Sequence, residues 1–357
     1  MTSSHSVPEA VSQRLLSFVA THREAALADS PEAALVIDAA ASALTGGKRL
    51  RARFCEAGWR AVSPAIGSDI IIDAAASLEI FQAAALVHDD IIDNSDTRRG
   101  RPAAHRGLEA MHAARGWTGD AAAFGRSAAI LLGDLLVAWS DDLFEEALLA
   151  HPAPRSARHE YARMRRDVTL GQFLDIAQES AWVTQPDEEH ADRALEVASL
   201  KSARYSVVQP LVIGACIGGA SDEQLEALRG FGLPIGLAFQ LRDDLLGVFG
   251  DAAVTGKPSG DDLREGKRTL LIAYARERMD AASRAALDAD LGRPDLDEAD
   301  VARLQAAIIA TGARDRVEQR ITAFTSQADA ALTSGVLAAD AVADLSALAH
   351  AATARTF

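Results

Sequence analysis

Two acidic clusters contain the residues whose types and spacing could do chemistry. The first is residues 88–93 (HDDIID) and the second is residues 240–246 (QLRDDLL), and each lies at the end of an apolar helical stretch. Carboxylates are costly where a helix buries apolar side chains unless a counter-charge neutralises them, and divalent cations do this well. The clusters therefore indicate a magnesium-dependent enzyme that acts on diphosphates.

The first cluster has helical spacing. Asp89 and Asp93 are one turn apart on one face and Asp90 lies beside them, so the carboxylates point into a shared space. The same pattern is also common on solvated surface helices. The context favours a site, because apolar side chains such as Leu78 and Val87 precede the cluster and predict a buried helix.

An arginine-rich loop follows this helix. Residues 96–102 (DTRRGRP) contain Arg98, Arg99 and Arg101. Magnesium bridges one or two carboxylates to phosphate, and arginine binds phosphate oxygens in pairs. The acidic helix and the arginine loop together predict a composite diphosphate site.

The second cluster is similar but less acidic. Gln240 lies on the same face as Asp243, Asp244 follows, and Gly247 stands where a third carboxylate would complete the pattern. We expect a somewhat lower capacity for metal. Lys257 and Lys267 follow in a glycine-containing loop and could bind phosphate as flexible cations.

Two further basic sites could bind anions. Gly46 and Gly47 open a helix start that carries Lys48 and Arg51, where free backbone N–H groups also favour an anion. Lys201 and Ser202 interrupt an apolar helix, and a buried lysine requires an acidic or phosphate partner. A surface position for Lys201 is the alternative.

Nucleotide and zinc motifs are excluded. Residues 260–269 resemble a P-loop superficially, but five residues separate the glycines, Arg268 follows the lysine, and no strand precedes the segment. The sequence also has no dinucleotide fingerprint and no zinc-ligand spacing.

The elements that position these residues are helices. Apolar residues make up 49% of the chain and aromatic residues only 5%, and apolar positions recur every three or four residues. The spacing predicts helices over 12–27, 31–44, 71–92, 121–149, 160–180, 192–219, 222–249, 268–285 and 298–350. It predicts connections at 45–47, 94–102, 185–187, 254–266 and 292–294. Ser221 is expected to cap a helix, and Pro210 and Pro234 to kink or end helices.

Composition limits the classes of partner. The formal net charge is −15, which argues against general binding to nucleic acid or to an anionic membrane. The N-terminus is not a signal peptide or anchor, and the apolar stretch at 211–220 is too short to span a bilayer. Cys55 and Cys216 are interpreted as buried core residues. We expect one soluble, cytoplasmic domain over residues 1–357, without stable membrane insertion and with residues 1–10 disordered.

Taken together and in order, the motifs over 46–269 resemble the trans-isoprenyl diphosphate synthases. These enzymes share Gly-Gly-Lys-Arg, Asp-Asp-x-x-Asp followed by Arg-Arg-Gly, Lys-Ser or Lys-Thr, and an aspartate pair after Phe-Gln. The resemblance implies an all-α fold of antiparallel helices around a deep central cavity. It also implies a homodimer and three Mg²⁺ ions on the diphosphate of an allylic substrate.

The resemblance also implies roles for individual residues. It makes Asp89, Asp93 and Asp243 the metal ligands, supported by Asp90 and Asp244. Cationic and polar side chains would surround the allylic diphosphate, namely Arg98, Lys201, Ser202, Gln240, Lys257 and Lys267, with Lys201 also counted as catalytic. Another set would bind the diphosphate of isopentenyl diphosphate, namely Lys48, Arg51, Gln82 and Arg99.

Chain length in this family depends on side chains one or two turns before the first aspartate. Ala84 and Ala85 occupy the near turn and Phe81 lies one turn deeper. One turn rises about 5.4 Å, roughly one isoprene unit. A floor at Phe81 favours geranylgeranyl diphosphate, while Leu78 below it leaves a longer product open.

Two other functions are alternatives. A class I terpene cyclase would share the fold, but it needs no second diphosphate site, so Lys48, Arg51 and Arg99 argue against it. A non-catalytic partner subunit would be expected to have lost its aspartates. The sequence leaves open the preferred allylic primer, the pathway served and the closure of the site by the C-terminus.

Overall fold

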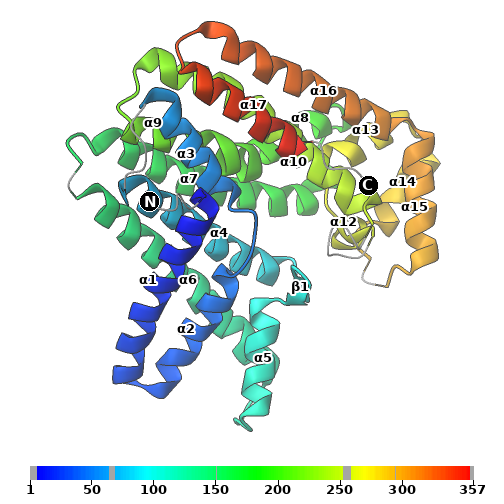
Figure 1. Ribbon diagram of the computed structural model, residues 1–357. Helices are drawn as coiled ribbons and strands as arrows, with labels where there is room; N and C mark the ends of the chain where they lie inside the picture. The colour runs from blue at the N-terminus through cyan, green and yellow to red at the C-terminus, as the bar shows by residue number, and fades with distance from the viewer. Residues whose placement is uncertain (1–5, 64–68, 150, 252–258, 294, 354–357) are drawn as a thin grey trace. The chain divides into compact units, whose positions relative to one another are not determined.

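The computed structural model describes residues 6–63, 69–149, 151–251, 259–293 and 295–353. Helices dominate these residues, which confirms the all-α prediction. The chain divides into two compact units, Met1–Pro154 and Arg155–Phe357 (Figure 1). One functional domain over 1–357 stays a prediction.

Unit 1 is built around the long buried helix α4. Its described elements are α1 (Val7–Asp29), α2 (Pro31–Leu44), α3 (Leu50–Val62), α4 (Asp69–Ile92), β1 (Thr97–Arg98), β2 (Arg101–Pro102), α5 (Ala104–Ala114) and α6 (Ala121–Leu148). Helix α4 packs against α1, α3 and α6, and α1 runs beside α2 (Figure 1). Because Leu78 and Ile80 are fully buried, the predicted buried helix is confirmed. The strands β1 and β2 form an antiparallel pair.

Unit 2 is built around α10, which packs against the π-helix η3 and against α16. Its described elements are α7 (Arg155–Ala181), η1 (Trp182–Thr184), η2 (Asp187–Glu189), α8 (His190–Val197), η3 (Ala198–Val208), α9 (Gln209–Ile217), α10 (Asp222–Phe249), α12 (Asp261–Glu265), α13 (Leu270–Arg278), α14 (Ala281–Asp290), α15 (Glu298–Ala310), α16 (Ala313–Ala331), η4 (Leu332–Ser334) and α17 (Ala339–Thr353). Leu241, Leu245 and Val248 of α10 contribute to its apolar core.

Local signals set several helix ends as predicted. Ser221 forms a capping box with Gln224 at the start of α10, because each side chain accepts a hydrogen bond from the other residue's backbone N–H. Pro234 does not end a helix, because it lies inside α10, which continues to Phe249. Pro210 lies next to the junction at which the π-helix η3 passes directly into α9.

Several predicted boundaries were wrong. A capping box at Ser6 starts α1 at Val7, so the expected disorder does not reach residue 10; residues 1–5 lie outside the described part of the chain. Only the start of α3 was predicted, α5 and α12 were not predicted, and 298–350 is divided among α15, α16, η4 and α17. Helix α12 has only five residues, too few for its apolar pattern to repeat clearly.

Two helices are long and apolar enough to span a membrane by length and composition, α4 and α6. The apolar window of α4 is 67% buried and that of α6 is 28% buried. Core helices of soluble proteins meet the same test of length and composition. The prediction considered only residues 211–220 as a membrane-spanning candidate, whereas α4 and α6 are longer apolar helices.

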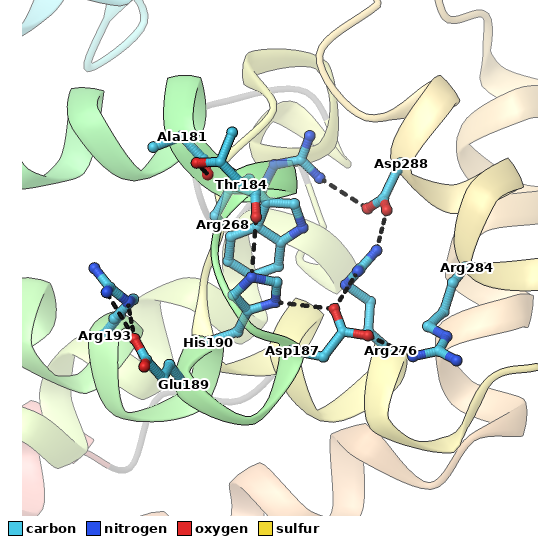
Figure 2. A network of polar contacts seen from close by, with 11 residues as sticks. Ala181, Thr184, Asp187, Glu189, His190, Arg193, Arg268, Arg276, Arg284 and Asp288 are labelled. Carbon is cyan, nitrogen blue, oxygen red and sulfur yellow. Dashed lines mark hydrogen bonds and ion pairs between the residues drawn. The ribbon is translucent and has the colours of Figure 1, made fainter. Parts of the chain in front are cut away.

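A polar network in unit 2 ties the connection after α7 to α13 and α14 (Figure 2). The buried His190 ring stacks on Trp182 with centroids 3.6 Å apart, and its Nε2 donates to the Trp182 carbonyl at 3.1 Å. Its Nδ1 lies 3.7 Å from Asp187, whose carboxylate accepts from Arg276 at 2.8 Å. Asp288 also binds Arg276 and lies 3.4 Å from Arg268.

This network predicts a pH-dependent stability. Burial lowers the pKa of His190 and the nearby Arg276 lowers it further, although Asp187, Asp288 and the Trp182 carbonyl oppose this. The unfolded chain therefore binds a proton before the folded chain does, so stability falls as pH drops below about 6.5. One such proton changes the free energy of unfolding by at most about 1.4 kcal/mol per pH unit.

The measurement is urea unfolding at pH 7.5 and pH 5.5. His190→Gln should lose less stability between the two pH values than the wild type does. His159→Gln alters an exposed histidine of the same unit and should leave the pH dependence unchanged. An identical pH dependence in His190→Gln and the wild type would contradict this account.

Candidate active site

The first acidic cluster forms the last turn of α4. Asp90 is buried and accepts a hydrogen bond from Arg98 Nε at 2.9 Å, while Arg98 Nη2 lies 3.5 Å from Asp89. Asp93 is half-buried, and its backbone N–H donates to the Asp89 carbonyl at 2.8 Å. Arg98 therefore contacts both Asp89 and Asp90, with Asp90 as the carboxylate that it holds most closely, and Asp93 follows one turn after Asp89.

Arg99 lies against the turn that precedes α3. Its guanidinium donates to the Thr45 carbonyl at 3.2 Å, and a Cβ on Gly47 would lie 3.0 Å from Arg99 Nη2. Gly47 has a φ of +89°, so a glycine here allows both the turn and the close approach of Arg99. The structure thus places the Gly-Gly turn and the arginine loop side by side.

Positive charge accumulates around Arg99. Local desolvation lowers the pKa of Arg99, and the charges of Arg49, Arg98 and Arg51 lower it further, while Glu79 opposes them. Clustered cations with a depressed pKa favour a bound anion. Lys48 is exposed at the same turn, and Arg51 and Gln82 are half-buried.

A buried ion pair supports this turn. Arg49 donates to the Leu44 carbonyl at 2.7 Å and lies 3.6 Å from Glu79 of α4. The other Glu79 oxygen accepts from the backbone N–H of Ala52 at 3.1 Å. The pair therefore links the start of α3 to α4.

Unit 1 also contains a cavity of about 310 Å³ between α2, α4 and α5. Ala83, Leu86, Val87 and Asp90 line it from α4, and Arg98 lines it from the hairpin. Phe81, Ala84 and Ala85 are not among its lining residues. This cavity is therefore distinct from the space that the chain-length prediction concerns.

The second acidic cluster lies in the last turns of α10. Gln240 Nε2 donates to Asp244 Oδ1 at 2.7 Å. Burial, together with the carboxylates of Asp262 and Asp243, raises the pKa of Asp244 to about 8. Such a concentration of negative charge favours a cation at this end of the helix.

The space above Gly247 is occupied by another carboxylate. A Cβ on Gly247 would lie 2.0 Å from Asp262 Oδ2, so Asp262 of α12 fills the place left by the missing side chain. Lys267 lies 3.4 Å from Asp262 and 2.6 Å from Glu265. Lys267 is thus next to the acidic cluster as predicted. Lys257 lies outside the described residues.

Lys201 and Ser202 lie in the π-helix η3, so the polar interruption of the apolar sequence coincides with a change of helix type. Lys201 is partly buried and forms an ion pair with Asp175 of α7 at 2.6 Å. The predicted acidic partner is therefore present. Ser202 is half-buried beside Lys201. π-Helical segments are often found at functional sites.

Two glycines let neighbouring helices approach η3. A Cβ on Gly171 of α7 would lie 2.4 Å from the Lys201 backbone N, and a Cβ on Gly236 of α10 would lie 2.6 Å from Ala203 Cα. Backbone atoms cannot move aside as a flexible side chain can. The position of η3 therefore depends on the absence of side chains at these two sites.

We expect Gly236→Ala to destabilise the protein by about 1–3 kcal/mol, the usual cost of overpacking a core. The matched control is Gly230→Ala on the same helix. Its Cβ would meet only Ala331 Cβ at 3.5 Å, so the change should be neutral or stabilise by up to about 1 kcal/mol. Denaturant unfolding measures both effects, and equal stability of the two variants would refute the expectation.

The donor set suits magnesium. Both clusters supply hard carboxylate oxygens, and no thiolate or imidazole is required. Among the described residues, no three Asp, Glu, His or Cys side chains form a group that could hold a metal ion by themselves.

Four functional candidates escaped the sequence analysis. They are Glu79, Asp175, Asp262 and the close pair formed by His88 and Gly133. The first three belong to chain segments other than those of their partners, so local spacing could not reveal them. Gly133 is one of two glycines inside the apolar stretch 121–149, and a glycine inside a helical pattern is a signal for a close packing contact.

Comparisons with known proteins give a consistent result. A family model described as polyprenyl synthetase matches residues 34–308. A geranylfarnesyl diphosphate synthase from Aeropyrum pernix is 33% identical over 79% of this chain and 82% of that protein. A short chain isoprenyl diphosphate synthase from Methanocaldococcus jannaschii is 30% identical over 72% of this chain and 70% of that protein.

A solved structure extends the likeness over almost the whole chain. It is a geranylgeranyl pyrophosphate synthase from Corynebacterium glutamicum in complex with isoprenyl diphosphate and magnesium. Its TM-score is 0.93 at 40% identity, covering 98% of this chain and 99% of that chain. The all-α architecture is therefore shared over this length.

Proposed function

The chain belongs to the polyprenyl synthetase family and is a prenyltransferase, and we propose that it condenses isopentenyl diphosphate with an allylic diphosphate. The observation that carries this proposal is the presence of two different kinds of anion site in unit 1. Asp89, Asp90 and Arg98 suit a metal-bound diphosphate, whereas the cations around Arg99 suit a diphosphate held without metal. Two substrates that each bear a diphosphate require both.

We propose Mg²⁺ as the cofactor, with three ions for each active site. Asp89 and Asp93 would hold it from α4 and Asp243 from α10, with Asp90 and Asp244 in support. When bound, Mg²⁺ supplies positive charge that stabilises the departing diphosphate.

The chain's own residues carry the remaining steps. Arg98, Lys201, Ser202, Gln240, Lys257 and Lys267 would bind the allylic diphosphate and stabilise its charge as the carbon–oxygen bond breaks. The Gly-Gly turn with Lys48, Arg51, Gln82 and Arg99 would orient isopentenyl diphosphate so that its double bond attacks the allylic cation. Loss of one proton, which the released diphosphate can accept, leaves a product five carbons longer.

Apolar walls serve the chemistry as well as the fold. Water would capture the allylic cation as an alcohol, so the site must exclude it. Ala84 and Phe81 are buried on α4, and Ala85 is half-buried one turn before Asp89. These small and apolar residues suit a prenyl chain that grows away from the aspartates.

We propose geranylgeranyl diphosphate as the main product. The rise from Asp89 back to Phe81 is about 12 Å at 1.5 Å per residue. The names of the relatives support a product of this length or slightly longer, since one is a geranylfarnesyl and another a geranylgeranyl synthase. A longer product is the second candidate, favoured by Leu78 at the next turn.

The proposal is tested by incubating purified protein with Mg²⁺, isopentenyl diphosphate and farnesyl diphosphate. Chromatography of the dephosphorylated products should show elongation, mainly to the geranylgeranyl alcohol, and EDTA should abolish it. Cyclic hydrocarbons would identify a cyclase instead. Inertness without another protein would indicate a partner subunit.

We propose that the enzyme is a homodimer that uses the exposed apolar face of α6. Leu131 is 66% exposed and Ile130 is 47% exposed. Adjacent large apolar side chains on a surface often mark a protein–protein interface. Leu131→Glu should therefore shift the mass measured by light scattering from dimer to monomer. A wild-type protein that is monomeric at micromolar concentration would contradict the proposal.

We propose a cytoplasmic location, which the two buried, free cysteines support.

A further inference from the structure

The His88 side chain packs the helix turn that carries the first aspartates against α6. The His88 ring lies in a hollow at Gly133, where an added Cβ would be only 2.1 Å from His88 Nε2 and 2.5 Å from Cδ2. His88 Nε2 is 3.2 Å from the Ile130 carbonyl oxygen and 3.6 Å from the Asp134 carboxylate. The imidazole thus contacts three positions on one face of α6.

The hydrogen bond defines the state of the ring. A carbonyl oxygen can only accept, so His88 Nε2 must carry the proton in this contact. The imidazole is therefore a donor with a fixed orientation. A glycine in the interior of a helix costs about 1 kcal/mol relative to alanine. Gly133 lacks a side chain at the position where the His88 ring lies, so the ring occupies the space that an alanine methyl group would need.

The last turn of α4 needs such an attachment. Asp89, Asp90 and Asp93 repel one another, and they lie at the negative end of the helix dipole. The helix ends at Ile92, and Asn94 then adopts a positive φ of 51°. Arg98 offsets part of this repulsion through Asp90 and Asp89, and the His88 contact adds a second attachment, to α6.

We propose that His88 is a positioning residue that clamps the last turn of α4 to α6 and so keeps Asp89 and Asp93 ready for Mg²⁺. The inference rests on the proposed function. His88 contacts neither substrate nor metal in this account and acts only through its neighbours. The contacts that carry it all lie within unit 1, between α4 and α6.

The test is Mg²⁺-dependent binding of inorganic pyrophosphate, measured by calorimetry at increasing Mg²⁺ concentration. His88→Ala should raise the Mg²⁺ concentration for half-maximal binding by about tenfold, as is typical when a residue behind a metal ligand is lost. His88→Gln keeps an N–H donor of similar reach and should restore binding to within about threefold of the wild type. The KM for isopentenyl diphosphate should stay unchanged.

Two further variants separate positioning from packing. Gly133→Ala fills the hollow from the partner helix and should reproduce the effect of His88→Ala. Asp134→Asn removes the exposed carboxylate and should behave as the wild type, since its side chain is 66% exposed. Thermal unfolding of each variant shows whether a loss of pyrophosphate binding reflects unfolding alone. If His88→Ala is unfolded, Gly133→Ala still tests the contact between His88 and α6.

The outcomes are distinct. Wild-type Mg²⁺ dependence in folded His88→Ala or Gly133→Ala would overturn the proposal. A raised KM for isopentenyl diphosphate with unchanged Mg²⁺ dependence would also overturn it, because His88 would then be a substrate contact. If the wild type bound no pyrophosphate with Mg²⁺ and elongated no substrate, the proposed function itself would fail.

Discussion

Asp89→Asn is expected to reduce kcat by at least about a hundredfold while leaving the fold intact. Loss of one group that stabilises developing charge commonly costs about 10²–10³ in rate, and Asp89 is proposed to hold the metal that does this. The substitution keeps the size of the side chain. It also removes repulsion from the nearby Asp90, which offsets the weakened contact with Arg98.

The matched control is Asp96→Asn. Asp96 follows the same cluster, but its side chain is 77% exposed and pairs with Arg106. Surface pairs of this kind contribute little to stability, and activity should be unaffected. Steady-state kinetics at saturating Mg²⁺, with circular dichroism as a check on folding, measures both variants. Near-normal turnover in Asp89→Asn would count against the metal role.

Phe81→Ala is expected to lengthen the product by at least one isoprene unit. Phe81 is buried two turns before Asp89 on the same face of α4, with the small side chain of Ala85 between them. Removing the ring would open the space beneath a chain that ends there. The reverse change, Ala85→Phe, should shorten the product for the same reason.

The control for this variant is Ile80→Ala. Ile80 is fully buried on another face of the same helix, so its truncation also costs about 2–5 kcal/mol of stability. If the chain length responds to position and not to a loosened core, only Phe81→Ala changes the products seen by chromatography. An unchanged product in Phe81→Ala would place the floor of the cavity on another helix.

Much of the fold follows from local chemistry. The buried helix α4 was predictable because its apolar positions continue for several turns, and the start of α10 was predictable because Ser221 and Gln224 satisfy each other's backbone groups. By contrast, α12 is only five residues long and the hairpin strands have two residues each. Elements this short do not repeat the apolar pattern often enough to be recognised.

The predicted site was incomplete where its parts come from distant segments. The aspartates of α4 and the arginines of the hairpin were found because they are close in sequence. Asp262 occupies the space above Gly247 but belongs to a different helix, and Asp175 pairs with Lys201 from 26 residues away. Such contacts depend on helix packing, which one sequence does not reveal.

We propose that Asp89 and Asp243 bind metal ions that share one diphosphate. The most direct measurement is a double-mutant cycle of Asp89→Asn and Asp243→Asn on Mg²⁺-dependent pyrophosphate binding. Residues that act on one shared assembly show strongly non-additive losses, so we predict that the double variant binds little worse than the weaker single variant. Fully additive losses would mean that the two aspartates act at independent sites, which would contradict the claim.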